Sequence, residues 1–449
     1  MQKLPQEFLS RMENMLGEEY GLFLDSYDKN KIQGLRINTL KSDGRAAFDE
    51  FELRPIPWCD SGYYFNADDR PGKSVLHEGG VFYIQEPSAM AVVESMNVRS
   101  GDKVLDLCAA PGGKSSQIAC KLKGSGLLVS NEIIPSRAKI LSQNIERMGV
   151  RNCVVLNQSP DTLSDRFSGV FDKILVDAPC SGEGMFRKNP LAIDEWSLAN
   201  VENCKLRQLD ILNQAVKMLK ADGVIVYSTC TFSKQENEEV IDEFLQNNEE
   251  FEVVENEFKF CQGYALDNSK FNAQLIKSNR IFPHKFDGEG HFFVILKRSG
   301  EASQNVKYSL QTVKADPKAV KEYKTWQNEN LNTQFDANLS FGQTLYCMPN
   351  GTPRLDGLKV ERAGLQLGEY KKNRFEPSHA LAMALREREV KRVLSLTRQD
   401  AEKYLSGQTL DVGGIKGWAL VTYNGVSLGW CKCDGAYAKN HYPKGLRKL

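Results

Sequence analysis

"KVLDLCAAPGGKSSQIA" (residues 103–119) is the stretch that decides the fold. It begins with a short apolar strand, turns tightly through Pro111, Gly112 and Gly113, and continues as the start of a helix. This geometry lets the backbone approach a ligand at the carboxyl edge of a parallel sheet. The stretch lacks the three spaced glycines that a dinucleotide pyrophosphate requires. We therefore expect a nucleotide-like ligand other than a dinucleotide.

The sequence around this stretch predicts an α/β domain with a Rossmann-like, doubly wound and mostly parallel sheet. Short apolar runs alternate with longer helical stretches between residues 101 and 298. That alternation is typical of a parallel sheet covered by helices on both faces. The runs are KVLDLCA, GLLVSNE, CVVLNQ, DKILVDAP, GVIVYSTC and HFFVILKR.

The flanking segments predict further domains. An amphipathic helix over residues 4–24 precedes the core, and a stretch rich in Lys, Gln and Asn follows it over residues 300–335. Near the end, the dipeptide at residues 424–425, Asn-Gly, indicates a two-residue hairpin turn. We predict an N-terminal accessory domain (residues 1–95), the core domain (96–299), a linker with a small intermediate domain (300–380) and a β-rich module (381–449).

Composition and charge exclude several classes of protein. The 449 residues include 58 Lys and Arg against 58 Asp and Glu, so any site for a polyanion must be a local patch. The 11 cysteines are too sparse for a disulfide scaffold, and no apolar run reaches the roughly 20 residues that span a bilayer. The cysteines and histidines also lack metal-site spacing. We expect a cytoplasmic monomer without a metal or a membrane partner.

Acidic residues close three of the predicted strands, and they indicate the ligand. Asp106, Glu132 and Asp177 would repel a pyrophosphate but suit a ribose and a positive centre. Glu132 lies 19 positions after Gly113, close to the roughly 20 expected for a carboxylate that binds ribose hydroxyls. S-adenosylmethionine is a nucleoside sulfonium without phosphate. We therefore predict S-adenosylmethionine as the cofactor.

Two cysteines, Cys180 and Cys230, follow predicted strand ends and suggest a reaction. Carbon 5 of cytosine is a poor nucleophile, but thiolate addition at carbon 6 makes it able to attack a sulfonium methyl group. A second group must then accept the carbon-5 proton while the thiolate leaves. Lys114 in the turn is the candidate for ionising a thiol, and Asp177 is the candidate for hydrogen bonding to the base.

Five segments together resemble the Nop/Sun family of RNA (cytosine-5) methyltransferases, in particular the bacterial RsmF type that acts on small-subunit ribosomal RNA. They are LDLCAAPGGKSSQIA, VDAPCSGEGMFRKNP, YSTCTFSKQENEEVI, FYIQEPSAMA and RIFPHKFDGEGHFFVILKR. The resemblance implies a class I S-adenosylmethionine-dependent core and a C-terminal PUA-like RNA-binding domain. It also implies that Cys230 is the nucleophile and that Cys180 helps to release the product.

The resemblance further implies which residues surround the cofactor. The family usually has an acidic adenine contact after the third strand, where this chain has Ser159, with Asp161 two positions later. The implied cofactor-binding residues are Cys108, Ala109, Ala110, Pro111, Gly112, Gly113, Lys114, Glu132, Arg137, Ser159 and Asp177.

RNA contacts are expected on both sides of the cofactor loop. The target cytosine must leave its stack to meet the thiols, and Arg187 and Lys188 follow the Cys180 loop where phosphates would pass. The resemblance adds Arg36 and Lys41 to the RNA surface. The acidic stretch at residues 235–258 is expected to face away from RNA.

The sequence thus predicts an S-adenosylmethionine-dependent methyltransferase that modifies carbon 5 of cytosine in small-subunit ribosomal RNA, alone or in the small ribosomal subunit. One alternative is a DNA cytosine methyltransferase, in which Cys180 itself attacks. Another is an assembly factor that binds ribosomal RNA without catalysis.

Overall fold

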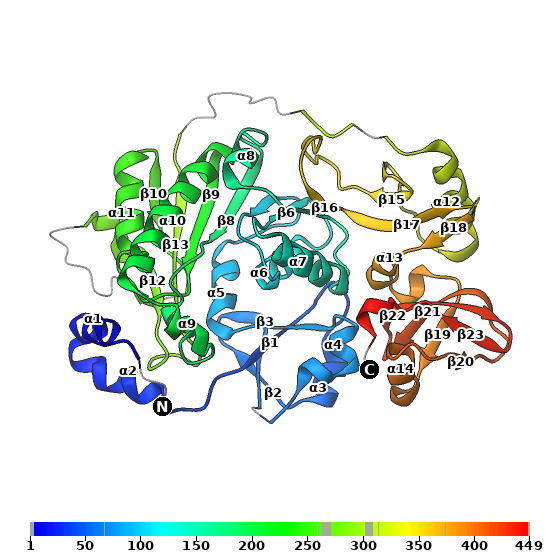
Figure 1. Cartoon of the computed structure of the whole chain (residues 1–449), viewed down its shortest axis with the longest axis horizontal. Coiled ribbons are helices and arrows are strands. Elements are labelled where there is room, and N and C mark those ends of the chain that lie inside the picture. Colours follow the sequence, from blue (N-terminus) through cyan, green and yellow to red (C-terminus); the bar gives the residue numbers. More distant parts are fainter. Residues whose placement is uncertain are drawn as a thin grey trace.

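The computed structural model describes residues 4–66, 68–258, 260–262, 271–300, 309–312, 314–372 and 374–447. Within these residues, a sheet of ten strands lies at the centre, and three smaller sheets flank it (Figure 1). The stretch predicted to bound the core domain, residues 300–335, includes residues 301–308 and 313, which lie outside the described residues.

The central sheet has the strand order β11-β12-β13-β9-β8-β5-β6-β7-β16, with β10 paired to β13. The strands from β9 to β7 run parallel to one another, whereas β13 and β16 are antiparallel to their neighbours. The bounds are β5 Lys103–Asp106, β6 Leu127–Asn131, β7 Cys153–Leu156, β8 Phe171–Asp177, β9 Leu219–Thr229, β10 Phe251–Val254, β11 Cys261–Gln262, β12 Asn279–Ile281, β13 His291–Arg298 and β16 Val360–Ala363. The predicted doubly wound α/β core is confirmed.

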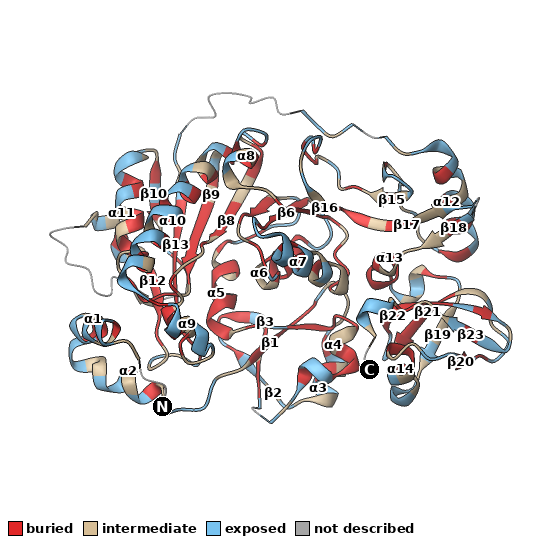
Figure 2. Cartoon of the chain, viewed as in Figure 1, coloured by how far each residue is buried: buried red, intermediate tan, exposed pale blue. Residues whose placement is uncertain are grey.

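Alternate residues of the parallel strands point into two separate hydrophobic cores, as strand geometry requires. Leu105 and Val129 belong to the core that α10 and α11 cover, whereas Val104 and Leu128 belong to the core under α5, α6 and α7. Figure 2 shows these strands buried between the helices. The helix bounds are α5 Pro87–Ser95, α6 Gly113–Leu122, α7 Pro135–Arg147, α8 Pro160–Ser164, α9 Pro190–Asp194, α10 Leu198–Met218 and α11 Glu238–Asn247.

The N-terminal helical region corrects one prediction. The single helix predicted over residues 4–24 is two helices, α1 (Gln6–Leu16) and α2 (Tyr20–Ser26). The chain breaks at Gly17, whose φ of 53° lies in the left-handed region that glycine tolerates. The break lets both helices contribute to one cluster, in which Phe8 and Phe23 pack near Trp196 of the core domain.

The N-terminal sheet also corrects a prediction, because Arg36 cannot contact RNA. The sheet consists of β1 (Gly34–Ile37), β2 (Leu53–Ile56), β3 (Cys59–Phe65) and β4 (Phe82–Ile84), with α3 (Arg45–Glu50) and α4 (Val75–Glu78) beside it. Arg36 is 0% exposed. It donates hydrogen bonds to Gln85 Oε1 at 3.0 Å, to the carbonyl oxygen of Gly113 at 3.2 Å and to Ser116 Oγ at 2.7 Å. Arg36 therefore fastens the N-terminal sheet to helix α6.

The C-terminal part forms two small sheets and returns once to the core. Strand β16, in the region predicted to be a linker and small domain, pairs antiparallel with β7. Asn424 and Gly425 have φ values of 48° and 75°, which confirms the predicted hairpin turn. The remaining bounds are β14 Leu339–Phe341, β15 Thr344–Cys347, β17 Leu365–Lys371, β18 Arg374–Pro377, β19 Val393–Leu396, β20 Leu410–Asp411, β21 Lys416–Tyr423, β22 Val426–Asp434, β23 Tyr437–Asn440, α12 Pro317–Asn330, α13 His379–Ala384 and α14 Arg398–Leu405.

The acidic stretch at residues 235–258 does not lie wholly on the surface. Glu236 and Glu238 are both 0% exposed. Arg280 Nε donates to Glu238 Oε1 at 2.7 Å, and NH2 donates to Oε2 at 2.5 Å. Arg280 NH1 donates to the carbonyl oxygen of Phe232 at 2.9 Å. This buried pair therefore joins β12 to the segment that follows Cys230.

We expect Arg280→Met to destabilise the core domain, because it leaves Glu238 buried without a cation. Breaking a buried ion pair on one side costs roughly 3 to 5 kcal/mol of unfolding free energy. Urea denaturation checks this loss. The double variant Arg280→Met with Glu238→Leu should recover most of it, since both charges are then absent. Equal stability of the single variant and the wild type would contradict the prediction.

Candidate active site

The two predicted cysteines lie side by side at the carboxyl edge of the central sheet. Cys180 follows β8 and Cys230 follows β9, and their Sγ atoms are 3.3 Å apart. The strands are parallel neighbours, with Asp177 opposite Ser228, so the loops after them emerge at the same edge. The pairing of β8 with β9 thus brings together two thiols that are distant in sequence.

The two thiols have different environments. The hydrogen bond with Cys230, together with burial, raises the pKa of the Cys180 thiol well above its usual value. A negative charge on Cys230 raises the pKa of Cys180 further. Cys180 therefore holds its proton at neutral pH.

Asp177 and Lys114 form a partly buried ion pair beside the thiols. Lys114 Nζ donates to Asp177 Oδ2 at 2.7 Å, and Ser228 Oγ donates to Asp177 Oδ1 at 2.7 Å. Burial raises the pKa of Asp177, but the Lys114 ammonium group outweighs burial and holds that pKa below its usual range. Burial lowers the pKa of Lys114, while Asp177 and then Cys230 raise it, and the net shift is upward. Lys114 therefore stays cationic near Cys230.

A cavity of about 600 Å³ opens at the same edge, within the range of small-molecule sites. Both cysteines line it, as do six of the predicted cofactor residues: Cys108, Ala110, Glu132, Arg137, Ser159 and Asp177. The structure therefore brings the predicted nucleophile and the predicted cofactor residues to one cavity.

The other five predicted cofactor residues belong to the turn next to Ala110 and do not line the cavity. They are Ala109, Pro111, Gly112, Gly113 and Lys114. The turn is held by Arg137, which donates from NH2 to the carbonyl oxygen of Ala110 at 2.9 Å, and by Asn144, which donates to that of Pro111 at 2.8 Å. Gly112 has a φ of 112°, and a Cβ there would lie 3.1 Å from Leu141. The turn thus shapes the wall through its backbone.

Polar groups at one end of the cavity suit a ribose and a purine. Glu132 is 3% exposed, accepts a hydrogen bond from the Ile134 amide at 3.0 Å and lies 3.5 Å from Arg137 NH1. Ser159 and Asp161 both line the cavity, so the structure places both predicted candidates for the adenine contact on its wall. A hydrogen bond from Ser159 lowers the pKa of Asp161.

Glu236 is a site residue that the sequence did not single out. Its Oε2 accepts hydrogen bonds from the Ser181 amide at 2.8 Å and from Gln208 Nε2 at 3.0 Å. Its Oε1 accepts from Ser181 Oγ at 2.5 Å and from Thr231 Oγ1 at 3.3 Å. Ser181 and Thr231 each follow one of the two cysteines, so one carboxyl group holds both cysteine loops. The only available signal was its place in the YSTCTFSKQENEEVI segment.

The prediction that Arg187 and Lys188 contact phosphates is corrected by the structure. Arg187 NH1 lies 3.5 Å from Glu289 Oε2, and NH2 donates to the carbonyl oxygens of Lys29 and Asn30. Its side chain is 6% exposed, and that of Glu289 is 1% exposed. Lys188 Nζ lies 3.7 Å from Glu289 Oε1. Both cations balance a buried carboxylate, and they are therefore not free surface charges.

Family models match four segments that together cover most of the chain. Residues 93–297 match the model for 16S rRNA methyltransferase RsmB/F, and residues 4–87 match the N-terminal domain of 16S rRNA methyltransferase RsmF. Residues 325–385 match the first C-terminal domain of RsmF rRNA methyltransferase, and residues 391–448 match the methyltransferase RsmF PUA domain.

Curated relatives agree with these models over nearly the whole length. Proteins named ribosomal RNA small subunit methyltransferase F from Vibrio atlanticus and Vibrio parahaemolyticus are 32% and 33% identical to this chain. Each comparison covers 99% of this chain and 97% of the relative. The chain belongs to the RsmF family of 16S rRNA methyltransferases.

RsmF membership confirms the predicted resemblance, the class of enzyme and S-adenosylmethionine as the cofactor. It also confirms the predicted PUA domain at the C-terminus. A methyltransferase homolog protein from Pyrococcus horikoshii has a TM-score of 0.59 and 25% identity, covering 66% of this chain and 95% of its own. NSun6 from the same organism, solved with SFG, has a TM-score of 0.58 and 21% identity, covering 67% of this chain and 100% of its own. The latter shares the fold.

The described part of this RsmF chain lacks two features that mark other classes of protein. It holds no helix with both the length and the apolar composition that a membrane crossing needs. Across the same ranges, no three His, Cys, Asp or Glu side chains are grouped so as to hold a metal ion. The roles of the individual site residues stay predictions.

We expect Glu236→Leu to lower kcat for methyl transfer by about 100-fold, because small displacements of reacting groups cost this much. Glu236→Gln should retain most of the activity. Its amide oxygen can accept from Ser181 and Gln208, while its amide nitrogen donates to the two hydroxyl groups. The rate of transfer of a labelled methyl group to small-subunit RNA is measured for both variants and the wild type. Equal rates for the three proteins would refute a positioning role for Glu236.

The pH dependence of the unfolding free energy tests whether burial perturbs the Glu236 carboxyl group. Burial raises the pKa of Glu236 to about 7, from a usual value of 4.5. A carboxyl group with a raised pKa in the folded protein stabilises it at low pH and loses that contribution as the pH rises through the folded value. The wild type should therefore lose unfolding free energy relative to Glu236→Gln between pH 5 and 8. A constant difference would show that the carboxyl group titrates normally.

Proposed function

We propose that this RsmF family member methylates carbon 5 of cytosine in small-subunit ribosomal RNA, with Cys230 as the nucleophile. The observation that carries the proposal is the 3.3 Å distance between the sulfurs of Cys180 and Cys230 on the wall of the cofactor-sized cavity. Covalent catalysis needs one group to attack and a second to take up the proton. We further propose that the enzyme acts in the cytoplasm on the RNA alone or on the small subunit.

The residues of the cavity suit S-adenosylmethionine. The buried Glu132 carboxylate can accept hydrogen bonds from a ribose diol, and Ile133 and Ile134 present exposed apolar surface for a purine ring. Asp177 and Asp210 add carboxylates to the lining, which suit a positively charged ligand. When bound, S-adenosylmethionine supplies the methyl group from its sulfonium centre.

In the proposed first step, the Cys230 thiolate adds to carbon 6 of the extruded cytosine. Lys114 is the nearby cation that stabilises this thiolate, although Asp177 shares its charge at 2.7 Å. Addition moves electron density to carbon 5, which would then be able to take a methyl group from the cofactor as the carbon–sulfur bond of the sulfonium breaks. Asp177 is positioned to accept a hydrogen bond from the amino edge of the base while density builds there.

In the second step, Cys180 accepts the carbon-5 proton, and the bond between carbon 6 and Cys230 breaks. Before addition, the Cys230 thiolate keeps Cys180 protonated, because it raises the pKa of Cys180. Once Cys230 has bonded to the base, it no longer carries that charge, so Cys180 releases its proton to solvent more easily. The pair thus supplies a base at the stage that requires one.

We expect Cys230→Ser to lower methyl transfer by about 1,000-fold or more, because nucleophilic catalysis is lost. Cys180→Ser should instead accumulate a covalent protein–RNA adduct, because elimination is slowed. Denaturing gels with labelled RNA measure the adduct, and Cys261→Ser is the matched control, since Cys261 lies outside the cavity. The opposite pattern, with methylation of duplex DNA, would favour the DNA methyltransferase alternative and refute the assignment.

The substrate is tested by mapping 5-methylcytosine across ribosomal RNA from cells with and without this protein. We expect at least one small-subunit cytosine to lose its methyl group in the deleted strain and to regain it with the wild-type gene. The Cys230→Ser gene should not restore it. Restoration by this variant would indicate a non-catalytic assembly role.

A further inference from the structure

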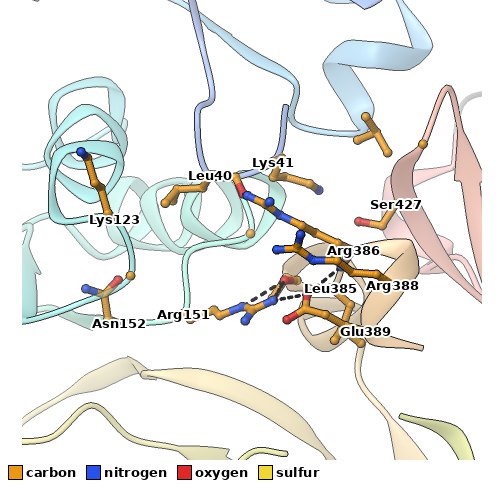
Figure 3. A pocket seen from close by; sticks show the side chains of 15 residues that line it. Leu40, Lys41, Lys123, Arg151, Asn152, Leu385, Arg386, Arg388, Glu389 and Ser427 are labelled. Atoms are coloured by element: carbon orange, nitrogen blue, oxygen red, sulfur yellow. Dashed lines mark hydrogen bonds and ion pairs between the residues drawn. The ribbon is translucent and has the colours of Figure 1, made fainter. Parts of the chain in front are cut away.

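A second pocket lies where three parts of the chain meet (Figure 3). We call it the junction pocket and define it by Lys41, Lys123, Arg151, Arg386 and Arg388. Lys41 follows β1 of the N-terminal sheet. In the core, Lys123 lies between α6 and β6, and Arg151 lies between α7 and β7. The two other arginines follow α13. Its volume is about 240 Å³, and it shares no lining residue with the cavity that holds the thiols.

Hydrogen bonds across the three parts fix the shape of the junction pocket. Arg386 NH2 donates to the carbonyl oxygen of Leu40 at 2.6 Å. Arg151 Nε donates to the carbonyl oxygen of Ala384 at 3.0 Å, and its NH2 donates to Glu389 Oε2 at 2.6 Å. The pocket is therefore built by contacts between the parts and is not a gap left between them.

Positive charge in the junction pocket is largely unbalanced. Glu389 is the one carboxylate among the described lining residues, and Arg151 already pairs with it. Across the described residues, the side chains of Lys41, Lys123 and Arg388 have no hydrogen-bond or ion-pair partner, and Lys41 Nζ is buried. Burial lowers the pKa of Lys41 to about 7, with a further contribution from Arg147. A bound anion would offset both effects.

We propose that the junction pocket binds a phosphate group of the RNA backbone, and this proposal rests on the proposed function. A chain without net charge must hold a polyanion on a local patch, and this pocket concentrates five basic side chains against one carboxylate. A phosphate held there links the N-terminal domain, the core and the C-terminal part to the same RNA.

Two observations favour an RNA strand over a free phosphate ion. Lys123, Arg386 and Arg388 are exposed, so a polymer can enter and leave along the surface. The volume of about 240 Å³ is several times the roughly 30 Å³ that one water occupies, which leaves room for a sugar beside the phosphate.

The test removes two unpaired cations from the full chain with Lys123→Gln and Arg388→Gln. The matched control is Lys318→Gln with Lys324→Gln, which removes two exposed lysines from α12. Affinity for small-subunit ribosomal RNA is measured by filter binding over a range of salt concentrations. We expect the junction variant to bind RNA about tenfold more weakly than the wild type. Its salt slope, the steepness with which log affinity falls with log salt concentration, should decrease by about 1 to 2, since each lost phosphate contact lowers it. The control should match the wild type.

Equal RNA affinity and salt slope in the junction and control variants would overturn the proposal. Methyl transfer by the wild type in that case would leave the proposed function standing, whereas a wild type without RNA binding or methyl transfer would refute both. Calorimetry with inorganic phosphate separates the two sources of the anion. Binding of phosphate by the wild type but not by the junction variant, with unchanged RNA affinity, would assign the pocket to the free ion and overturn the proposal.

Discussion

The parallel pairing of β8 with β9 is the constraint on which the reaction centre depends. It places Asp177 opposite Ser228 and lets the two following loops leave the sheet at the same edge. The sulfurs of Cys180 and Cys230 therefore meet at 3.3 Å although 50 positions separate them. A shift in this register would move both the thiols and the Asp177 carboxylate away from the cavity.

Two carboxyl groups, one buried and one on the cavity wall, hold this arrangement. Glu236 accepts hydrogen bonds from residues next to each cysteine, and Asp177 accepts from Lys114 and Ser228. One carboxyl group has a raised pKa and the other a lowered pKa, because only Asp177 faces a cation. The site thus contains one carboxyl group that positions the loops and another that faces the cavity.

The sequence predicted the features that depend on local patterns. In a parallel sheet, the carboxyl ends of neighbouring strands lie at one edge. Asp177, Cys180 and Cys230 could therefore be placed together from the sequence, and so could the turn at Pro111, which also follows a strand of this sheet. Residues whose partners are distant in sequence were beyond such reasoning. The sequence alone predicts that Arg187 is a surface cation, whereas the fold places the Glu289 carboxylate beside it. Glu236 could not be distinguished from the acidic residues around it, since burial depends on tertiary packing.

Strand β16 gives the C-terminal half a role in the architecture of the catalytic domain. It pairs with β7, where Val360 lies opposite Leu156 and Ala363 opposite Val154. Without it, β7 would be an edge strand with unpaired amide and carbonyl groups, a known starting point for aggregation. A methyltransferase domain cut off before β16 would therefore expose β7 as an edge of the central sheet.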